Sequence, residues 1–159
     1  MHNHHLKAVF IIEILAFIAI AFMAVAVEGP TGGVFVRNTH FGLSGDVWLF
    51  VVAIPLLLLI PLVMDGFHSK IVGTLLSGAF IGVVLEDFTW FLINPNYGLQ
   101  NFNPSKATWL AWANFGSFSV PIGYIIGVAL ALLSWFVFIR NAGRIDATYK
   151  RMRRAIAKP

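Results

Sequence analysis

Two adjacent carboxylic acids, Glu86 and Asp87, interrupt a long apolar stretch of this chain. An ionised acid is costly inside hydrocarbon unless it is paired, hydrated or protonated. Trp90 follows Asp87 by three residues and Asn94 follows Trp90 by four, so the three side chains share one face. Glu86, Asp87, Trp90 and Asn94 therefore predict a ligand or ion site. The alternative is a purely structural pair of acids that accepts hydrogen bonds from Trp, Tyr or loop backbone donors.

A divalent metal ion is one candidate ligand, because carboxylates and imidazole are suitable donors for such ions. Glu28 and His40 are expected on the same side of the membrane as Glu86 and Asp87, and these four residues form the hypothetical metal site. The chain has no fixed ligand spacing such as HExxH. A histidine of an interfacial loop is the alternative interpretation of His40. No other cofactor is indicated.

Catalytic motifs are missing from the sequence. It has no nucleophile elbow, no phosphate-binding glycine loop, and no cysteine for a thiolate site or a disulfide. We therefore do not predict an enzyme. A membrane enzyme that uses the two acids as general acid or base on a lipid-like substrate is a third and weaker hypothesis.

The elements that position these residues are apolar stretches long enough to cross a membrane, which takes about 20 residues. The chain is 58% hydrophobic and only 11% charged. The predicted spans are 8–27, 47–64, 72–93 and 118–139. We expect an all-α polytopic membrane protein, with a four-helix transmembrane domain over 1–139 and a basic tail over 140–159.

The basic residues predict the orientation. The tail contains most of them: Arg140, Arg144, Lys150, Arg151, Arg153, Arg154 and Lys158. Each other connection or end has one: Lys7, Arg37, Lys70 and Lys106. The positive-inside rule then predicts a multi-pass plasma (inner) membrane protein with both termini in the cytoplasm, and places Glu86 and Asp87 toward the outside.

The first apolar stretch also resembles a cleavable signal peptide, because Lys7 precedes it and small residues end it. It is longer than a usual signal-peptide core and contains Glu13, so we expect a retained helix. Glu13 is predicted near the inner end of this helix, where it would extend to the interface. That position would be too far from Glu86 to join its site.

Small residues at four-residue spacing predict close helix packing. Gly78 and Gly82 lie on the face of the third span that also bears Glu86. Gly123 and Gly127 form a matching pair in the fourth span. We expect the two helices to touch along these glycines.

The outer loop before the fourth span is rich in aromatic and amide residues. Asn103 followed by Pro104 resembles an N-cap and a first helical residue. This predicts a short interfacial helix over residues 104–114. Its Trp109 and Trp112 would anchor the helix at the membrane surface, or would form part of a lid over the acids.

The tail combines its basic residues with apolar ones at helical spacing: Ile145, Tyr149, Met152 and Ile156. It should form an amphipathic helix on the cytoplasmic leaflet, attracted by anionic lipids. Nucleic-acid binding is not expected, because the basic residues lie on a terminal tail and form no folded basic face.

The leading hypothesis is a small membrane protein with an outward-facing carboxylate site for a proton, a cation or metal ion, or a small ligand. The alternative is a structural or accessory subunit of a larger membrane complex, or a homo-oligomer. It is motivated by the lack of internal repeats and by the almost wholly apolar second span, which could face lipid or a partner.

Overall fold

The computed structural model describes residues 3–28, 54–95 and 97–156. Its long helices are α1 (Asn3–Glu28), α4 (Ser69–Ile93) and α5 (Ile122–Ser134), which the π-helical segment η3 (Trp135–Arg140) continues. These three helical segments are long and apolar enough to cross a membrane. The chain is thus a mostly helical membrane protein, as predicted.

The second predicted span is only partly described. Its described part is α3 (Ile54–Asp65), a short apolar helix with Pro61 inside it. Its 12 residues extend about 18 Å, less than the thickness of the hydrocarbon. Residues 47–53 lie outside the described part of the chain, so the fourth crossing stays a prediction.

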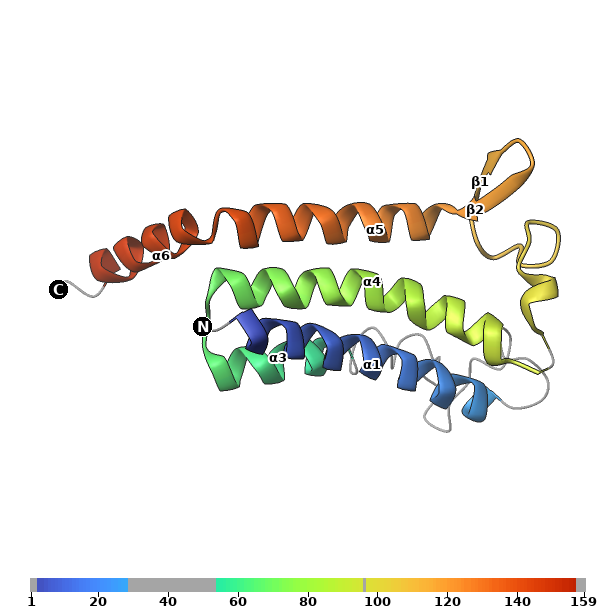
Figure 1. Cartoon of the computed structure of the whole chain (residues 1–159), viewed down its shortest axis with the longest axis horizontal. Helices are drawn as coiled ribbons and strands as arrows, with labels where there is room; N and C mark the ends of the chain where they lie inside the picture. Colours follow the sequence, from blue (N-terminus) through green and yellow to red (C-terminus); the bar gives the residue numbers. More distant parts are fainter. Residues whose placement is uncertain (1–2, 29–53, 96, 157–159) are drawn as a thin grey trace.

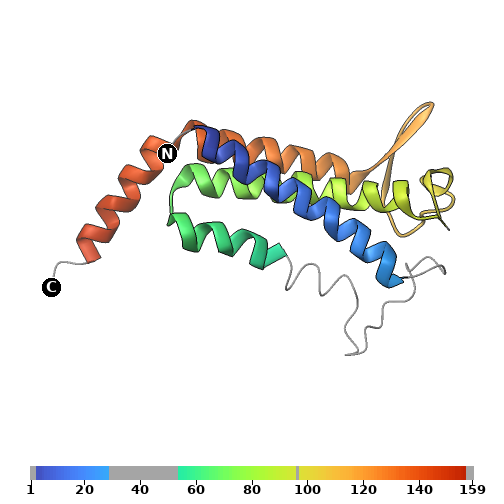
Figure 2. The same ribbon diagram turned by 60° about the horizontal axis from the view of Figure 1, so that its bottom comes forward.

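Helix α4 lies at the centre of the described bundle, between α1 and α5 (Figure 1). α1 runs parallel to α4, whereas α5 runs antiparallel to it (Figures 1 and 2). We call the end that holds the residues between α4 and α5 the hairpin end. The opposite end, from which the helix α6 (Ala142–Ile156) projects, is the α6 end.

The α1–α4 contact depends on two glycines of α4. A Cβ atom at Gly78 would lie 2.1 Å from a carboxylate oxygen of Glu13, and one at Gly82 would lie 2.2 Å from the ring of Phe17. Only glycine allows these side chains to approach so closely. The four-residue spacing on both helices keeps them in register.

The α4–α5 contact uses a different face of α4. Gly127 packs against Phe80 and Val84, and the Ser77 hydroxyl donates a 2.9 Å hydrogen bond to the carbonyl oxygen of Ala131. The prediction that the two helices touch is confirmed. The predicted pairing of glycines is wrong, because Gly78 and Gly82 face α1, and a Cβ atom at Gly123 would meet nothing within 4 Å.

The predicted interfacial helix over residues 104–114 is also wrong. The segment forms turns, followed by the hairpin of β1 (Trp112–Phe115) and β2 (Phe118–Pro121); the 3-10 turn η2 (Leu99–Asn101) precedes it. The predicted cap does form, since Asn103 Oδ1 accepts the Ser105 and Lys106 N–H groups. No helix follows this turn. Gly116, in the left-handed conformation (φ 69°), closes the hairpin.

The hairpin also changes the predicted start of the last span. Residues 118–121 form β2, so α5 begins at Ile122 and not at Phe118. The Ile122 N–H donates a 2.7 Å hydrogen bond to the Ala111 carbonyl group, which joins the first turn of α5 to the segment before β1. The described part of the chain is therefore helical with one small antiparallel hairpin.

At the other end, α6 is fastened to the first residue of α4. Asp146 accepts hydrogen bonds from the N–H group and the hydroxyl group of Ser69, at 3.0 and 2.5 Å. Burial favours a higher pKa for Asp146, but these two bonds, together with His68 and Lys150, lower it below its usual value of 3.8. α4 begins at Ser69, three residues before the predicted Val72, and the Asp146 carboxylate stabilises this first turn by accepting the Ser69 N–H.

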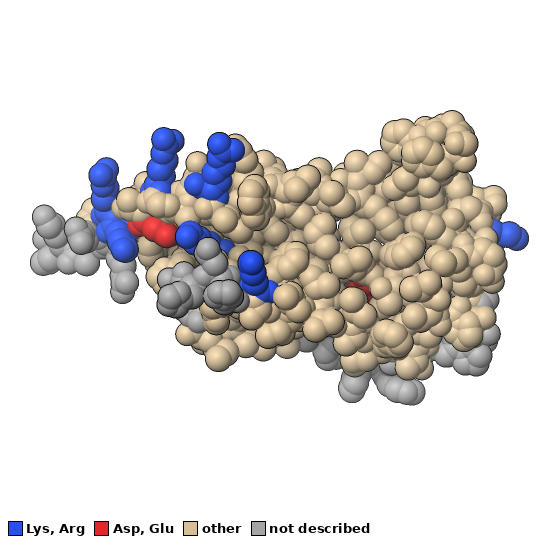
Figure 3. All heavy atoms as spheres, viewed as in Figure 1, with Lys and Arg blue, Asp and Glu red and all other residues tan. Residues whose placement is uncertain are grey.

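The described charges concentrate at the α6 end. Figure 3 shows Lys and Arg side chains gathered over that end, while the surface along the middle of the bundle has almost no charge. Lys106 is the one described basic residue of the segment between α4 and α5. The basic residues are thus concentrated at the α6 end of the structure, as the orientation predicted from the positive-inside rule requires.

Candidate functional site

One buried stripe of α4 contains most of the predicted site. All of its members are buried: Thr74, Gly78, Gly82, Glu86, Trp90 and Asn94. Glu86 is 9% exposed. Because Glu13 and Phe17 of α1 lie opposite Gly78 and Gly82, the same spacing brings the fully buried Ala21 level with Glu86. Glu86 thus belongs to the α1–α4 interface.

Asp87 does not belong to this stripe, although it was predicted to share a face with Trp90 and Asn94. Successive residues of an α-helix differ in direction by about 100°, so Asp87 is directed away from Glu86 and toward α5. Its Oδ2 atom accepts a 2.6 Å hydrogen bond from the hydroxyl group of Tyr124 in α5. Glu86 lies within electrostatic reach of the same hydroxyl group. The two acids therefore belong to two helix interfaces, with Tyr124 as their common neighbour.

Aromatic rings from the segment after α4 cover the Asp87–Tyr124 pair at the hairpin end. Phe102 stacks on Tyr124 with ring centroids 5.8 Å apart, and it also contacts Phe91 at 4.9 Å and Trp112 at 5.1 Å. We call these rings, together with those of Trp90, Tyr97 and Trp109, the aromatic cluster. It places the Asp87–Tyr124 hydrogen bond under an apolar cover.

The two predicted tryptophan anchors both contact rings of this cluster, and Trp109 is 36% exposed. Trp109 lies nearly parallel to Phe91 at 6.1 Å, and the indole N–H of Trp112 donates a 2.9 Å hydrogen bond to the Ala107 carbonyl oxygen. Phe102, which the sequence did not single out, is the ring of this segment that reaches Tyr124.

Asn94 and Trp90 shape the end of α4. Asn94 is 2% exposed, and its backbone N–H donates to the Trp90 carbonyl oxygen at 3.0 Å. Asn94 Oδ1 accepts the Tyr97 N–H at 3.1 Å. Burial raises the pKa of the Tyr97 hydroxyl group above its usual value. The Asn94 side chain therefore stabilises the turn that places Tyr97 in the aromatic cluster.

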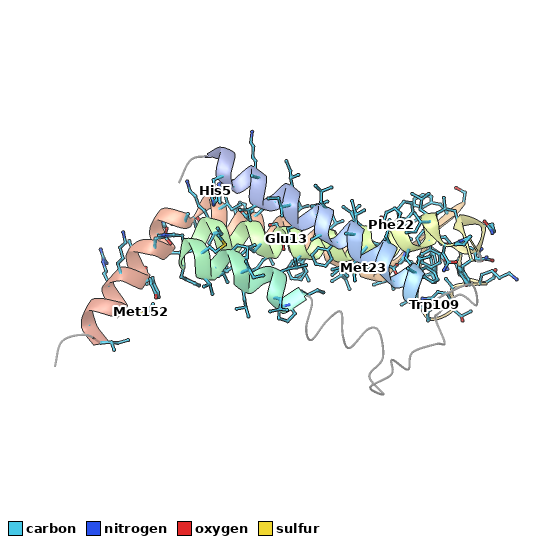
Figure 4. All side chains as sticks on the ribbon, turned by 90° about the horizontal axis from the view of Figure 1, so that it is seen from below. His5, Glu13, Phe22, Met23, Trp109 and Met152 are labelled. Carbon is cyan, nitrogen blue, oxygen red and sulfur yellow. The ribbon has the colours of Figure 1, made fainter. Side chains whose placement is uncertain are left out.

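Glu13 lies elsewhere than predicted. It is 4% exposed and is buried in the α1–α4 interface, about half-way along the bundle (Figure 4). Both of its carboxylate oxygens lack a hydrogen-bond partner among the described residues. It does not extend to the membrane–water interface, because Gly78 leaves a space for its carboxyl group beside α4.

The metal hypothesis is only partly testable. Within residues 3–28, 54–95 and 97–156, no three His, Asp or Glu side chains gather as metal ligands would. His40 lies outside these ranges, and the structure does not describe the side chain of Glu28. The four-residue metal site of Glu28, His40, Glu86 and Asp87 stays a prediction.

Neither Tyr124 as the partner of Asp87 nor the buried position of Glu13 was predicted from the sequence. A signal for Glu13 was present, since Glu13, Phe17 and Ala21 repeat every four residues and all three are buried. Matching this stripe to Gly78 and Gly82 would have paired α1 with α4.

Nothing matches this chain among protein families, curated proteins or solved structures. Its function is therefore argued from its own residues.

Proposed function

We propose that this chain is a four-span plasma (inner) membrane protein, with both termini in the cytoplasm, that binds or conducts a proton or cation at Glu86 and Asp87. In this orientation the hairpin end faces outside. The proposal rests on one observation above all: two adjacent acids lie within one apolar helix, one of them buried against α1 and the other bonded to Tyr124.

The physical argument is the cost of these groups. Acids inside a membrane domain are expensive, and a protein that only needed to pack its helices could use apolar side chains at both positions. The aromatic cluster adds a low-dielectric cover, which strengthens any electrostatic interaction with a bound cation. A small ligand that carries a cationic group would meet the same chemistry.

The test uses purified protein in liposomes that contain a pH-sensitive dye. Wild-type protein should dissipate an imposed proton gradient, or a gradient of a monovalent or divalent cation, whereas the Glu86→Gln/Asp87→Asn double variant should not. Asp146→Asn is the matched control, because it makes the same chemical change outside the spans. Unaltered flux and unaltered cation binding in a double variant that folds normally would refute the proposal.

An accessory subunit of a membrane complex is the second candidate. The observation in its favour is the apolar helix α3, whose Leu56, Leu59 and Val63 are exposed and available to lipid or to a partner. Size measurement in mild detergent separates the two. A stable, active monomer excludes the subunit role, whereas co-purification with one partner in a fixed ratio supports it.

We further propose that α6 lies on the cytoplasmic leaflet and contacts anionic lipids. Exposed Arg144, Lys150 and Arg151 accompany the exposed apolar side chains of Tyr149 and Met152. Each basic residue near an anionic leaflet contributes about 1 kcal/mol. A polarity-sensitive dye on Met152→Cys should shift to the blue in anionic nanodiscs and not in zwitterionic ones; equal spectra would exclude lipid-specific contact.

A further inference from the structure

Glu13 is a second acidic position, separate from Glu86 and Asp87. Glu13 is 4% exposed, and its carboxyl group faces Gly78 of α4 and has no hydrogen-bond partner among the described residues. Gly78 and Glu86 are eight residues apart in α4. Because Glu13 lies opposite Gly78, Glu13 and Glu86 are separated by about 12 Å along the helix axis.

Phe17 fills the space between these two levels. Its ring is fully buried and lies against Gly82, which is half-way between Gly78 and Glu86 in α4. An apolar ring cannot relay a proton, and it excludes a continuous chain of water at this level. Glu13 thus lies about two helical turns from the Glu86–Asp87 pair, with Phe17 packed between the two levels.

The ionisable groups on the helices around Glu13 are distant in the sequence. Among the described side chains of α1 these are His5 and Lys7, and on α4 they are Lys70 and the acid pair. Helix α3 supplies none over residues 54–64, and α5 with η3 supplies Tyr124 and Arg140, at opposite ends. A buried carboxylate without a partner is unstable, whereas the neutral acid keeps the same packing without the charge.

We propose that Glu13 is a proton-binding site inside the membrane domain, separate from the acid pair, and that its proton exchanges with solvent water. In the exchange the Glu13 O–H bond breaks, its proton passes to a water molecule to form hydronium, and the carboxylate remains. Reprotonation reverses the step. Phe17 separates this site from the acid pair at the hairpin end.

Infrared spectroscopy of the protein in nanodiscs tests the site directly. A protonated carboxyl group has a C=O stretch distinct from that of a carboxylate, and deuterium exchange shifts it. We expect a band that Glu13→Gln removes, that Glu13→Asp retains at a changed frequency, and that the Glu86→Gln/Asp87→Asn variant leaves in place. All three variants keep side chains of similar size, so their folding is checked by thermal unfolding of the same samples.

Three results would overturn the proposal: no such band in wild type, a band unchanged in Glu13→Gln, or a band that deuterium does not shift. The last would make Glu13 a sealed structural acid. Any part of Glu13 in proton flux rests on the proposed function, whereas its protonation does not. If the Glu86→Gln/Asp87→Asn variant keeps full flux but the Glu13 band behaves as expected, the proposed function fails and this inference stands.

Discussion

The hydroxyl group of Tyr124 and the carboxylate of Asp87, 37 positions apart in the chain, form a 2.6 Å hydrogen bond that joins α5 to α4. Polar bonds between transmembrane helices contribute modestly, with measured values of about 0.6 kcal/mol on average and about 1.7 kcal/mol at most. The bond also fixes the orientation of one of the two acids of the proposed site.

Replacing Tyr124 by Phe should therefore have two effects. The bundle should lose about 0.6–1.7 kcal/mol of stability in denaturant titrations. The cation or proton dependence of the site should also change, because Asp87 loses its donor. Tyr149→Phe is the matched control, since it removes a hydroxyl group from an exposed ring of α6. Equal behaviour of the two variants would mean that the Tyr124 bond has no energetic role.

Gly82→Ala should destabilise the α1–α4 contact. The added Cβ atom would lie 2.2 Å from the Phe17 ring, so one of the helices has to move, at a cost of about 1–3 kcal/mol. Gly123→Ala adds the same methyl group where nothing lies within 4 Å, and it should leave the melting temperature unchanged or slightly raised. A normal melting temperature for Gly82→Ala would contradict the described packing of Phe17.

Acidification should release α6 from α4. Because the folded pKa of Asp146 is lowered, its bonds to Ser69 stabilise the structure above the usual pKa of 3.8, and this contribution disappears as the pH falls through the folded pKa. The Ser69 amide should therefore lose protection from hydrogen exchange below about pH 4. In Asp146→Asn the protection should be lower at neutral pH and should lack this acid transition; an identical pH profile in both proteins would exclude the role of Asp146.

The topology can be mapped with single cysteines, because the chain has none of its own. Ser117→Cys lies in the exposed turn of the hairpin, and Ala147→Cys lies on the exposed face of α6. A membrane-impermeant maleimide should label Ser117→Cys in intact cells, and should label Ala147→Cys only after permeabilisation. The reverse pattern would invert the proposed orientation, and labelling of both in intact cells would argue against a membrane crossing by α5.

Much of the architecture follows from hydropathy, which is a property of the sequence itself. The stretches around α1, α4 and α5 are too apolar for water, and inside lipid their backbone groups must bond within a helix. The four-residue stripe from Thr74 to Asn94 was also predictable, and every member of it is buried. The Asn103 cap formed as expected, although the helix that it was expected to begin did not.

What the sequence by itself determined is therefore which segments enter the membrane and which face of α4 is buried, because length, hydropathy and helical period depend on local residues alone. The tertiary structure decided which neighbour that face meets. Gly78 and Gly82 could have accepted α5, but Glu13 and Phe17 of α1 fill the spaces above them. Shape complementarity between helices distant in the chain has no local signature, so the partners of Glu13 and Asp87 became known only when the helices were assembled.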